Sequence, residues 1–267
     1  MRKARCHTTA GTVKVRSYEV EAAFYTHFAH RCDPALCRVP RCIDATASPE
    51  IVIRLEDLDA AGFPGRGRQD VDGCVRWLAA FHAAFMGIPD PGGLLWERGL
   101  YWYLATRPDE LAALPDKSRL KQSAMAIDHR LDACRFKTLV HGDAKVANFC
   151  FGKKVGDPVA ACDFQYVGSG VGVCDVAYFM TNVVRDNAPV SDVMAILAMY
   201  FQHLRSHMCL FDTVDLIEAE WRDAFPFAVA DFYRFYCGWG LLSEKRLPAW
   251  VDHFVRIAVS QLPPATC

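Results

Sequence analysis

One stretch, residues 139–180, constrains the chain more than any other, because it spaces three oxygen-bearing side chains around a predicted hairpin. It reads LVHGDAKVANFCFGKKVGDPVAACDFQYVGSGVGVCDVAYFM. Asp143 and Asn148 fall on one loop, just before the apolar run FCF, and Asp163 follows the apolar run VAAC. The turn GKKVGDP separates the two runs, which predicts a β-hairpin. Pairing of its strands would bring all three side chains to one end of the sheet.

This set of side chains suits phosphoryl transfer. The transition state of that reaction is loose, so catalysis consists mostly of positioning and charge neutralisation. Mg²⁺ prefers carboxylate, amide and phosphate oxygens in near-octahedral geometry. Asp163 and Asn148 offer one charged and one neutral oxygen, which leaves Asp143 to align an acceptor hydroxyl and accept its proton late in the reaction.

The order HGD, Asn148 and D-F-Q resembles the aminoglycoside phosphotransferase and choline kinase family of the protein-kinase-like fold. The closest resemblance is to its ecdysteroid-kinase-like, or CHK-kinase-like, branch. The resemblance implies an α+β, two-lobed fold that uses ATP and Mg²⁺ to phosphorylate a hydroxyl of a small molecule. It also implies that Asp143 and Lys145 are catalytic residues, and that Asn148 and Asp163 bind the metal.

Further landmarks extend the resemblance from about Ser17 to the C-terminus. EVEAAFY resembles the N-lobe helix of the family and makes Glu21 the ion-pair glutamate. IVIRLEDL resembles the strand that enters the hinge, where backbone groups of Glu56, Asp57 and Leu58 would contact adenine.

Two further segments complete the match. WLAAFHA, at residues 77–83, resembles the family's L-A-x-x-H-A helix, and GSGVGVCDVAYF resembles the segment that follows the metal site. The resemblance implies that Asp175, in this last segment, braces the catalytic loop. His141 is expected to support the same loop by hydrogen bonding.

Several of these residues have a second interpretation. Glu21 could be an ordinary exposed helix glutamate, and Lys145 could be a solvated loop lysine rather than a contact of the transferred phosphoryl group. His82, on an apolar helix, is interpreted as a structural histidine rather than a catalyst. The aromatic stretch from Trp221 to Glu244 fits a cation-binding pocket, but its helical spacing favours ordinary packing.

The pattern predicts a partial N-lobe at residues 1–59, a linker at 60–70 and a C-lobe at 71–267 that is mainly helical. Helices are expected at Ser17–Ala29 and Val71–Met86, and a strand at Glu50–Leu58. Only sixteen residues precede Ser17, and they contain no G-x-G-x-x-G sequence.

The family's usual lysine, on a strand before the helix, has no clear counterpart. Lys3 has a compatible position but no strand pattern around it, and Lys14 is expected to belong to the approach to the helix. The resemblance therefore implies a truncated N-lobe, from a fragment, an incomplete gene model or a degenerate paralogue. An alternative function follows, namely a catalytically weak, kinase-like binding or scaffold protein. The presence of Asp143, Asn148 and Asp163 favours the enzyme.

Composition narrows the partners and the compartment. Thirty Lys and Arg residues against 31 Asp and Glu give a net charge of −1, so no nucleic-acid partner is expected. No apolar run reaches the roughly 18 residues that a membrane span needs, so no membrane partner is expected either. The twelve cysteines form no CxxC pair, so the usual zinc-binding spacing is absent. Free thiols in a reducing compartment, the cytoplasm, are favoured over disulfides in a chain of this size. The oligomeric state and the identity of the acceptor stay open.

Overall fold

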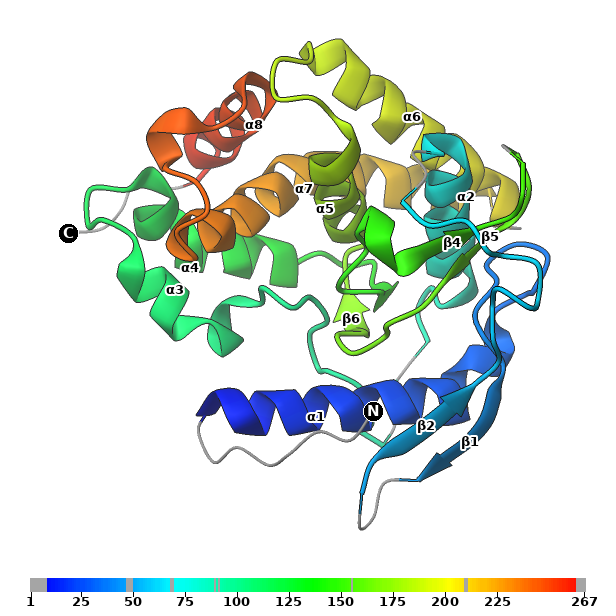
Figure 1. Cartoon of the computed structure of the whole chain (residues 1–267). Coiled ribbons are helices and arrows are strands. Elements are labelled where there is room, and N and C mark those ends of the chain that lie inside the picture. The colour runs from blue at the N-terminus through cyan, green and yellow to red at the C-terminus, as the bar shows by residue number, and fades with distance from the viewer. Residues whose placement is uncertain are drawn as a thin grey trace.

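Helices dominate the chain beyond residue 70, and short strands occur in three separate pairs (Figure 1). The computed structural model describes residues 9–46, 50–67, 70–88, 90, 92–154, 156–208 and 211–262. The α-helices in this part of the chain are α1 (Thr9–Ala23), α2 (Val71–Ala84), α3 (Pro108–Ala113), α4 (Arg119–Asp132), α5 (Val173–Val183), α6 (Val190–His207), α7 (Phe211–Gly238) and α8 (Ala249–Ser260). The strands are β1 (Cys42–Thr46), β2 (Val52–Leu55), β3 (Thr138–Val140), β4 (Phe149–Phe151), β5 (Val159–Ala161) and β6 (Gly168–Gly170).

The N-terminal part consists of α1 and the antiparallel pair β1–β2, which lie together below the helical body in Figure 1. The helix expected at Ser17–Ala29 begins earlier, at Thr9, and continues as a π-helical turn over Phe24–Phe28. Strand β2 is shorter than the strand expected at Glu50–Leu58, and its partner β1 was not predicted. CIDAT, the sequence of β1, alternates apolar and polar residues over only four positions and includes Asp44 and Ala45, whose residue types have low strand propensity.

The predicted linker at 60–70 packs against the helical body. The backbone groups of Gly65 and Phe151 exchange two hydrogen bonds, of 2.9 and 3.0 Å. The segment before β1 attaches to the same hairpin, because the Ala161 amide donates to the Arg38 carbonyl at 3.0 Å. The boundaries of the two lobes stay a prediction.

Helix α2 follows the sequence pattern closely. The side chain of Asp70 caps its first turn by accepting a hydrogen bond from the Gly73 amide at 2.9 Å. Val75, Leu78 and Phe81 recur at helical spacing and are all fully buried. The predicted helix is therefore confirmed, and it ends at Ala84.

The predicted hairpin is also confirmed. Strands β4 and β5 pair antiparallel, with Phe149 opposite Ala161 and Phe151 opposite Val159. Beyond the paired strands, the Cys162 amide donates to the Asn148 carbonyl at 3.0 Å. The residue before Asp163 thus lies opposite Asn148, as the sequence predicts.

The phenylalanine of D-F-Q lies at the centre of an aromatic core. The ring of Phe164 stacks on Phe24 of the N-terminal part with a centroid distance of 4.0 Å, and lies 4.6 Å from His141. Trp77 and Phe81 of α2 complete the cluster. These rings are buried, so the same apolar contacts that hold the N-terminal part to the body also fix the segment after Asp163.

A buried carboxylate on α5 holds residues 141–148, the predicted catalytic loop. Asp175 accepts hydrogen bonds from the backbone amides of His141, at 2.6 Å, and Gly142, at 3.0 Å. His82 of α2 lies 3.1 Å from the same carboxylate through Nε2, and its Nδ1 is 2.8 Å from the Tyr200 hydroxyl. His82 is fully buried and hydrogen-bonded on both nitrogens, which agrees with the structural interpretation.

The loop turns at Gly142, whose φ of +79° is in the left-handed region. A Cβ at this position would lie 2.1 Å from the Tyr166 carbonyl oxygen and 2.8 Å from the Leu100 amide nitrogen. Both the conformation and the close approach of two backbone segments therefore require glycine here.

We expect Gly142→Ala to destabilise the protein much more than Gly240→Ala. Gly240 has nearly the same φ, +80°, but a Cβ there would meet nothing within 4 Å. The control should lose about 1–2 kcal/mol from backbone strain alone, and Gly142→Ala a further ~2 kcal/mol from the backbone clash. Urea unfolding of both variants measures the difference. Equal losses would mean that the loop has room for a side chain.

Asp175→Asn should also destabilise the fold, by roughly 3 kcal/mol, because an amide nitrogen would face a buried N–H donor. Asp44→Asn, which weakens an exposed ion pair with Arg54, should cost less than about 1 kcal/mol. Thermal and urea unfolding of the two variants test this expectation. A stability of Asp175→Asn close to that of the control would contradict the bracing role.

Candidate active site

The catalytic loop gathers three of the predicted site residues in one hydrogen-bonded group. Asp143 is buried, and its Oδ2 lies 2.7 Å from Lys145 Nζ. The Asn148 side-chain amide donates to the Asp143 carbonyl at 2.8 Å and to Oδ2 at 3.0 Å. The sequence LVHGDAKVAN produces this arrangement because a 3₁₀ turn, Val146–Asn148, folds the chain back before β4.

The donor set fits a divalent cation that is also bound by phosphate oxygens. Because the side-chain nitrogen of Asn148 donates to Asp143, the side-chain oxygen Oδ1 of Asn148 is left for a ligand such as a metal. Asp163, one residue beyond the partner of Asn148 in the hairpin, has a φ of +71°, a strained value for a non-glycine residue. No group of three or more His, Cys, Asp or Glu side chains among the described residues could hold a metal alone.

The other loop residues predicted from the sequence lie against this group. His141 Nδ1 is 3.2 Å from the Asp143 amide, and its Nε2 is 3.1 Å from the Cys162 carbonyl. His141 therefore connects the predicted catalytic loop to the strand that leads to Asp163, while Asp175 holds the same loop on α5.

Glu21, on α1, contacts the segment after Asp163. Its Oε1 accepts a hydrogen bond from the Phe164 amide at 3.2 Å. Lys14 lies about two turns earlier on the same helix, and its carbonyl accepts a hydrogen bond from the Ser17 hydroxyl. Lys3 lies outside the described residues. The ion pair expected for Glu21 stays a prediction.

The predicted hinge at 56–58 follows β2. The Arg41 amide and the Arg38 guanidinium lower the pKa of the Glu56 carboxyl, which pairs with Arg38 at 2.5 Å. The carbonyls of Asp57 and Leu58 accept turn hydrogen bonds from Ala61 and Phe63. The Glu56 amide donates to the Arg41 carbonyl at 2.9 Å. The adenine contact expected from backbone groups of residues 56–58 stays a prediction.

Two tyrosines beside Asp143 were missed in the sequence. The Tyr178 hydroxyl donates to Asp143 Oδ1 at 3.2 Å, and the ring of Tyr101 packs edge to face against that of Tyr178 with a centroid distance of 5.5 Å. Burial raises the pKa of both hydroxyls, that of Tyr101 to about 12. Tyr178 had a signal in the sequence, since it follows Asp175 by three residues and so lies on the same helix face. Tyr101, far away in the sequence, had none.

The aromatic stretch of α7 mostly packs the core. Phe232, Tyr233 and Phe235 are buried, whereas Trp239 is 58% exposed. A guanidinium already lies over one of these rings, because Arg107 is 5.5 Å from the centroid of Phe235.

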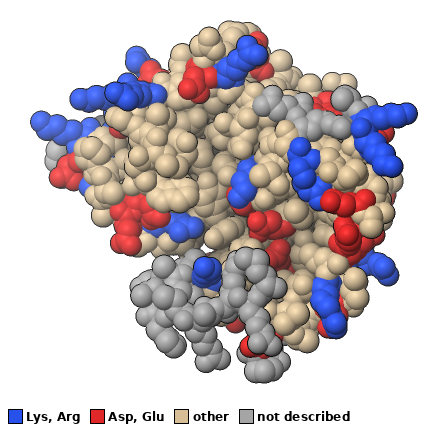
Figure 2. Space-filling view, in the orientation of Figure 1, with Lys and Arg blue, Asp and Glu red and all other residues tan. Residues whose placement is uncertain are grey.

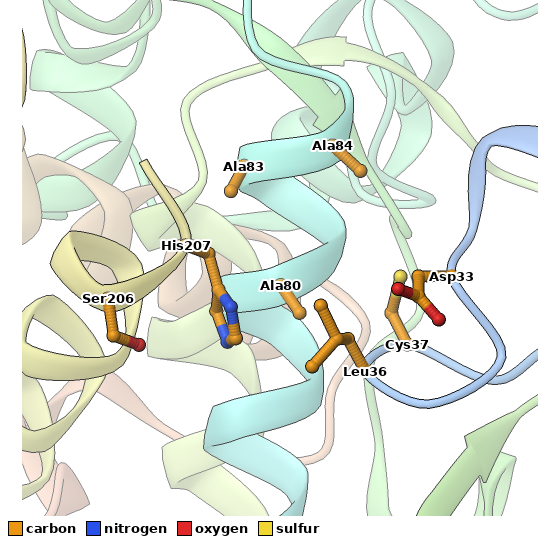
Figure 3. Close-up of a pocket in the computed structure, with 8 residues that line it drawn as sticks. All are labelled: Asp33, Leu36, Cys37, Ala80, Ala83, Ala84, Ser206 and His207. Carbon is orange, nitrogen blue, oxygen red and sulfur yellow. The ribbon is translucent and has the colours of Figure 1, made fainter. Parts of the chain in front are cut away.

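Two hollows lie at other places on the molecule. One, of about 290 Å³, is bounded by Cys37, Ala80 and His207, among others (Figure 3). Another, of about 980 Å³, lies between Leu114–Arg119 and the segment that follows α7. Neither is lined by a predicted site residue.

The surface carries both signs of charge. On the face shown in Figure 2, Lys and Arg side chains are interspersed with Asp and Glu side chains.

Nine of the cysteines are described, and all nine are free thiols. None of the described helices has the length and apolar character to cross a membrane.

Several solved structures have folds similar to that of this chain. An amicoumacin kinase, hAmiN, solved with AMP-PNP, Ca²⁺ and Ami, matches with a TM-score of 0.54 and 13% identity, over 94% of this chain and 78% of the other. A choline/ethanolamine kinase family protein from Mesorhizobium loti matches with a TM-score of 0.46 and 13% identity, over 93% and 80%. A microcompartment-associated aminopropanol kinase matches with a TM-score of 0.47 and 13% identity, over 97% and 82%. No curated protein matches the sequence.

The amicoumacin kinase match confirms the protein-kinase-like fold with its mainly helical C-terminal part. The sequence, rather than the fold, shows the family of this chain. The family model described as the phosphotransferase enzyme family matches residues 8–210, well over half of the chain. The CHK-kinase-like branch stays a prediction, but the wider family is confirmed, and this chain belongs to the phosphotransferase enzyme family.

Proposed function

We propose that the protein is a kinase that transfers the γ-phosphoryl group of ATP to a hydroxyl group of a small molecule in the cytoplasm. The observation that carries this proposal is the group formed by Asp143, Lys145 and Asn148, at the end of the hairpin that leads to Asp163. Membership of the phosphotransferase family supports the reaction type. The free thiols of the described cysteines agree with a reducing compartment.

Asp143 aligns the acceptor in this proposal. Its carboxylate is held by Lys145 and Asn148, so it presents a fixed oxygen to the incoming hydroxyl. Lys145 is about one third exposed, with 36% of its side chain accessible, and can reach from Asp143 to the transferred phosphoryl group. In a loose transition state, positioning and charge neutralisation of this kind supply most of the catalysis.

Asn148 and Asp163 bind Mg²⁺ in this proposal, together with phosphate oxygens of the nucleotide and water. When bound, the cation neutralises charge that develops on the phosphates. The amicoumacin kinase that shares this fold was solved with AMP-PNP and Ca²⁺, which supports the use of a nucleotide and a divalent cation here. Glu21 and backbone groups of residues 56–58 would then contact the nucleotide from the N-terminal part.

Asp163→Ala should abolish metal-dependent nucleotide binding, because it removes the one full negative charge assigned to the cation. Asn148→Ala should weaken binding less, since it removes a neutral oxygen. Asp157→Asn is a matched control, because Asp157 lies in the turn of the same hairpin and accepts from the Lys154 amide. Calorimetric titration with AMP-PNP, with and without Mg²⁺, measures all four proteins. An unchanged Mg²⁺ dependence in Asp163→Ala would refute the metal assignment.

Asp143→Asn should lower the rate of phosphoryl transfer by about 10²-fold or more, the usual effect of losing a positioned acid–base group. Nucleotide affinity should stay within about twofold of the wild type, because Asp143 is not assigned to the metal. Single-turnover transfer from ATP to a panel of small alcohols, and to water, provides the rate. Equal rates for the two proteins would exclude Asp143. If both proteins bind nucleotide and neither transfers phosphate, the scaffold function is favoured instead.

A further inference from the structure

Tyr178 is the third described donor to the Asp143 carboxylate, beside Lys145 and Asn148. Those two residues both contact Oδ2, at 2.7 and 3.0 Å. The Tyr178 hydroxyl contacts the other oxygen, Oδ1, at 3.2 Å. The two sides of the carboxylate are therefore held by different elements, the loop itself on one side and α5 on the other.

The ring of Tyr178 has little freedom to move. It lies between Trp102 and Phe232, with centroid distances of 5.1 and 4.8 Å, and only 7% of the residue is exposed. Its backbone position is fixed as well, because Asp175, one turn earlier on α5, is hydrogen-bonded to the catalytic loop. Both ends of the Tyr178–Asp143 contact are thus anchored by the same helix.

Tyr101 packs against the ring of Tyr178. The two rings lie edge to face, with a centroid distance of 5.5 Å. The Tyr101 amide donates to the Gly142 carbonyl at 3.0 Å, which ties Tyr101 to the catalytic loop. Its neighbour Leu100 has a φ of +95°, a strained conformation that the surrounding structure must impose.

The lone pairs of Asp143 then indicate where an acceptor can bind. An ionised carboxylate has about four acceptor positions, two on each oxygen. Lys145 and Asn148 use both positions of Oδ2, and Tyr178 uses one of Oδ1. One position on Oδ1 is left, next to the tyrosine hydroxyl, and an aligned acceptor must come within hydrogen-bond reach of it.

We propose that Tyr178 is a positioning residue, which holds the Asp143 carboxylate so that Oδ1 faces the acceptor hydroxyl. The proposal rests on the kinase function proposed above. Tyr101 contributes through Tyr178, and neither tyrosine exchanges a proton with the substrate. The high pKa of the Tyr178 hydroxyl, which results from burial and from the Asp143 charge, is consistent with a donor that keeps its proton.

The test compares Tyr178→Phe, Tyr101→Phe and the control Tyr233→Phe. Tyr233 is another buried tyrosine, on α7, whose ring packs against Phe232 and Trp250. Single-turnover transfer from γ-³²P-labelled ATP to water, and to any alcohol that the wild type phosphorylates, gives the rates. We expect kcat to fall about tenfold in Tyr178→Phe, as for the loss of one hydrogen bond to a charged group. The kcat of Tyr101→Phe, which keeps the ring that packs against Tyr178, should fall by less than about twofold, and that of Tyr233→Phe should not change.

A double-mutant cycle separates positioning from a general structural role. In the Asp143→Asn background, Tyr178→Phe should change kcat by less than about twofold, because the group it acts through is gone. KM values, nucleotide affinity and melting temperature should match those of the parent proteins. A wild-type kcat in Tyr178→Phe, or the same tenfold loss in both backgrounds, would overturn the role of Tyr178 alone. Absence of any transfer by the wild type would instead overturn the kinase function and this role with it.

Discussion

The geometry of the candidate active site depends on the carboxylate of Asp175. It is completely buried, and it accepts hydrogen bonds from two consecutive amides of the catalytic loop while His82 approaches from α2. A buried charge is tolerated only when hydrogen-bond donors of this kind satisfy it. Packing of α5 against the loop and α2 therefore depends on these hydrogen bonds. The left-handed turn at Gly142 follows from this arrangement, because it directs both amides toward one carboxylate.

Much of this arrangement is predictable from local sequence. The hairpin follows from two apolar runs and a polar, glycine-containing turn, and the position of Asp163 beside Asn148 follows from pairing of its strands. Helix α2 follows from its capping residue and its apolar period. In these cases one short segment contains all the information, so the sequence predicts both the element and the residues it brings together.

Contacts between distant segments were not predictable in the same way. Strand β6 reads GSG, a sequence with low strand propensity, and it forms because glycine lets it approach β3 and Trp96 closely. Tyr101 reaches the site only through a strained loop, and no spacing relates it to Tyr178. The earlier start of α1 was missed because the segment from Thr9 to Arg16 has no apolar periodicity.

In the proposed function, Asn148 and Asp163 hold the divalent cation of a nucleotide beside the predicted catalytic loop. Paramagnetic broadening of backbone amide resonances by Mn²⁺ in the presence of AMP-PNP tests this metal site most directly, because the measurement requires no knowledge of the acceptor. We expect broadening centred on the amides of residues 145–148 and 162–164, with α8 unaffected, and loss of the broadening on addition of excess Mg²⁺. Broadening that is centred elsewhere, or that does not depend on the nucleotide, would rule out a cation held by Asn148 and Asp163.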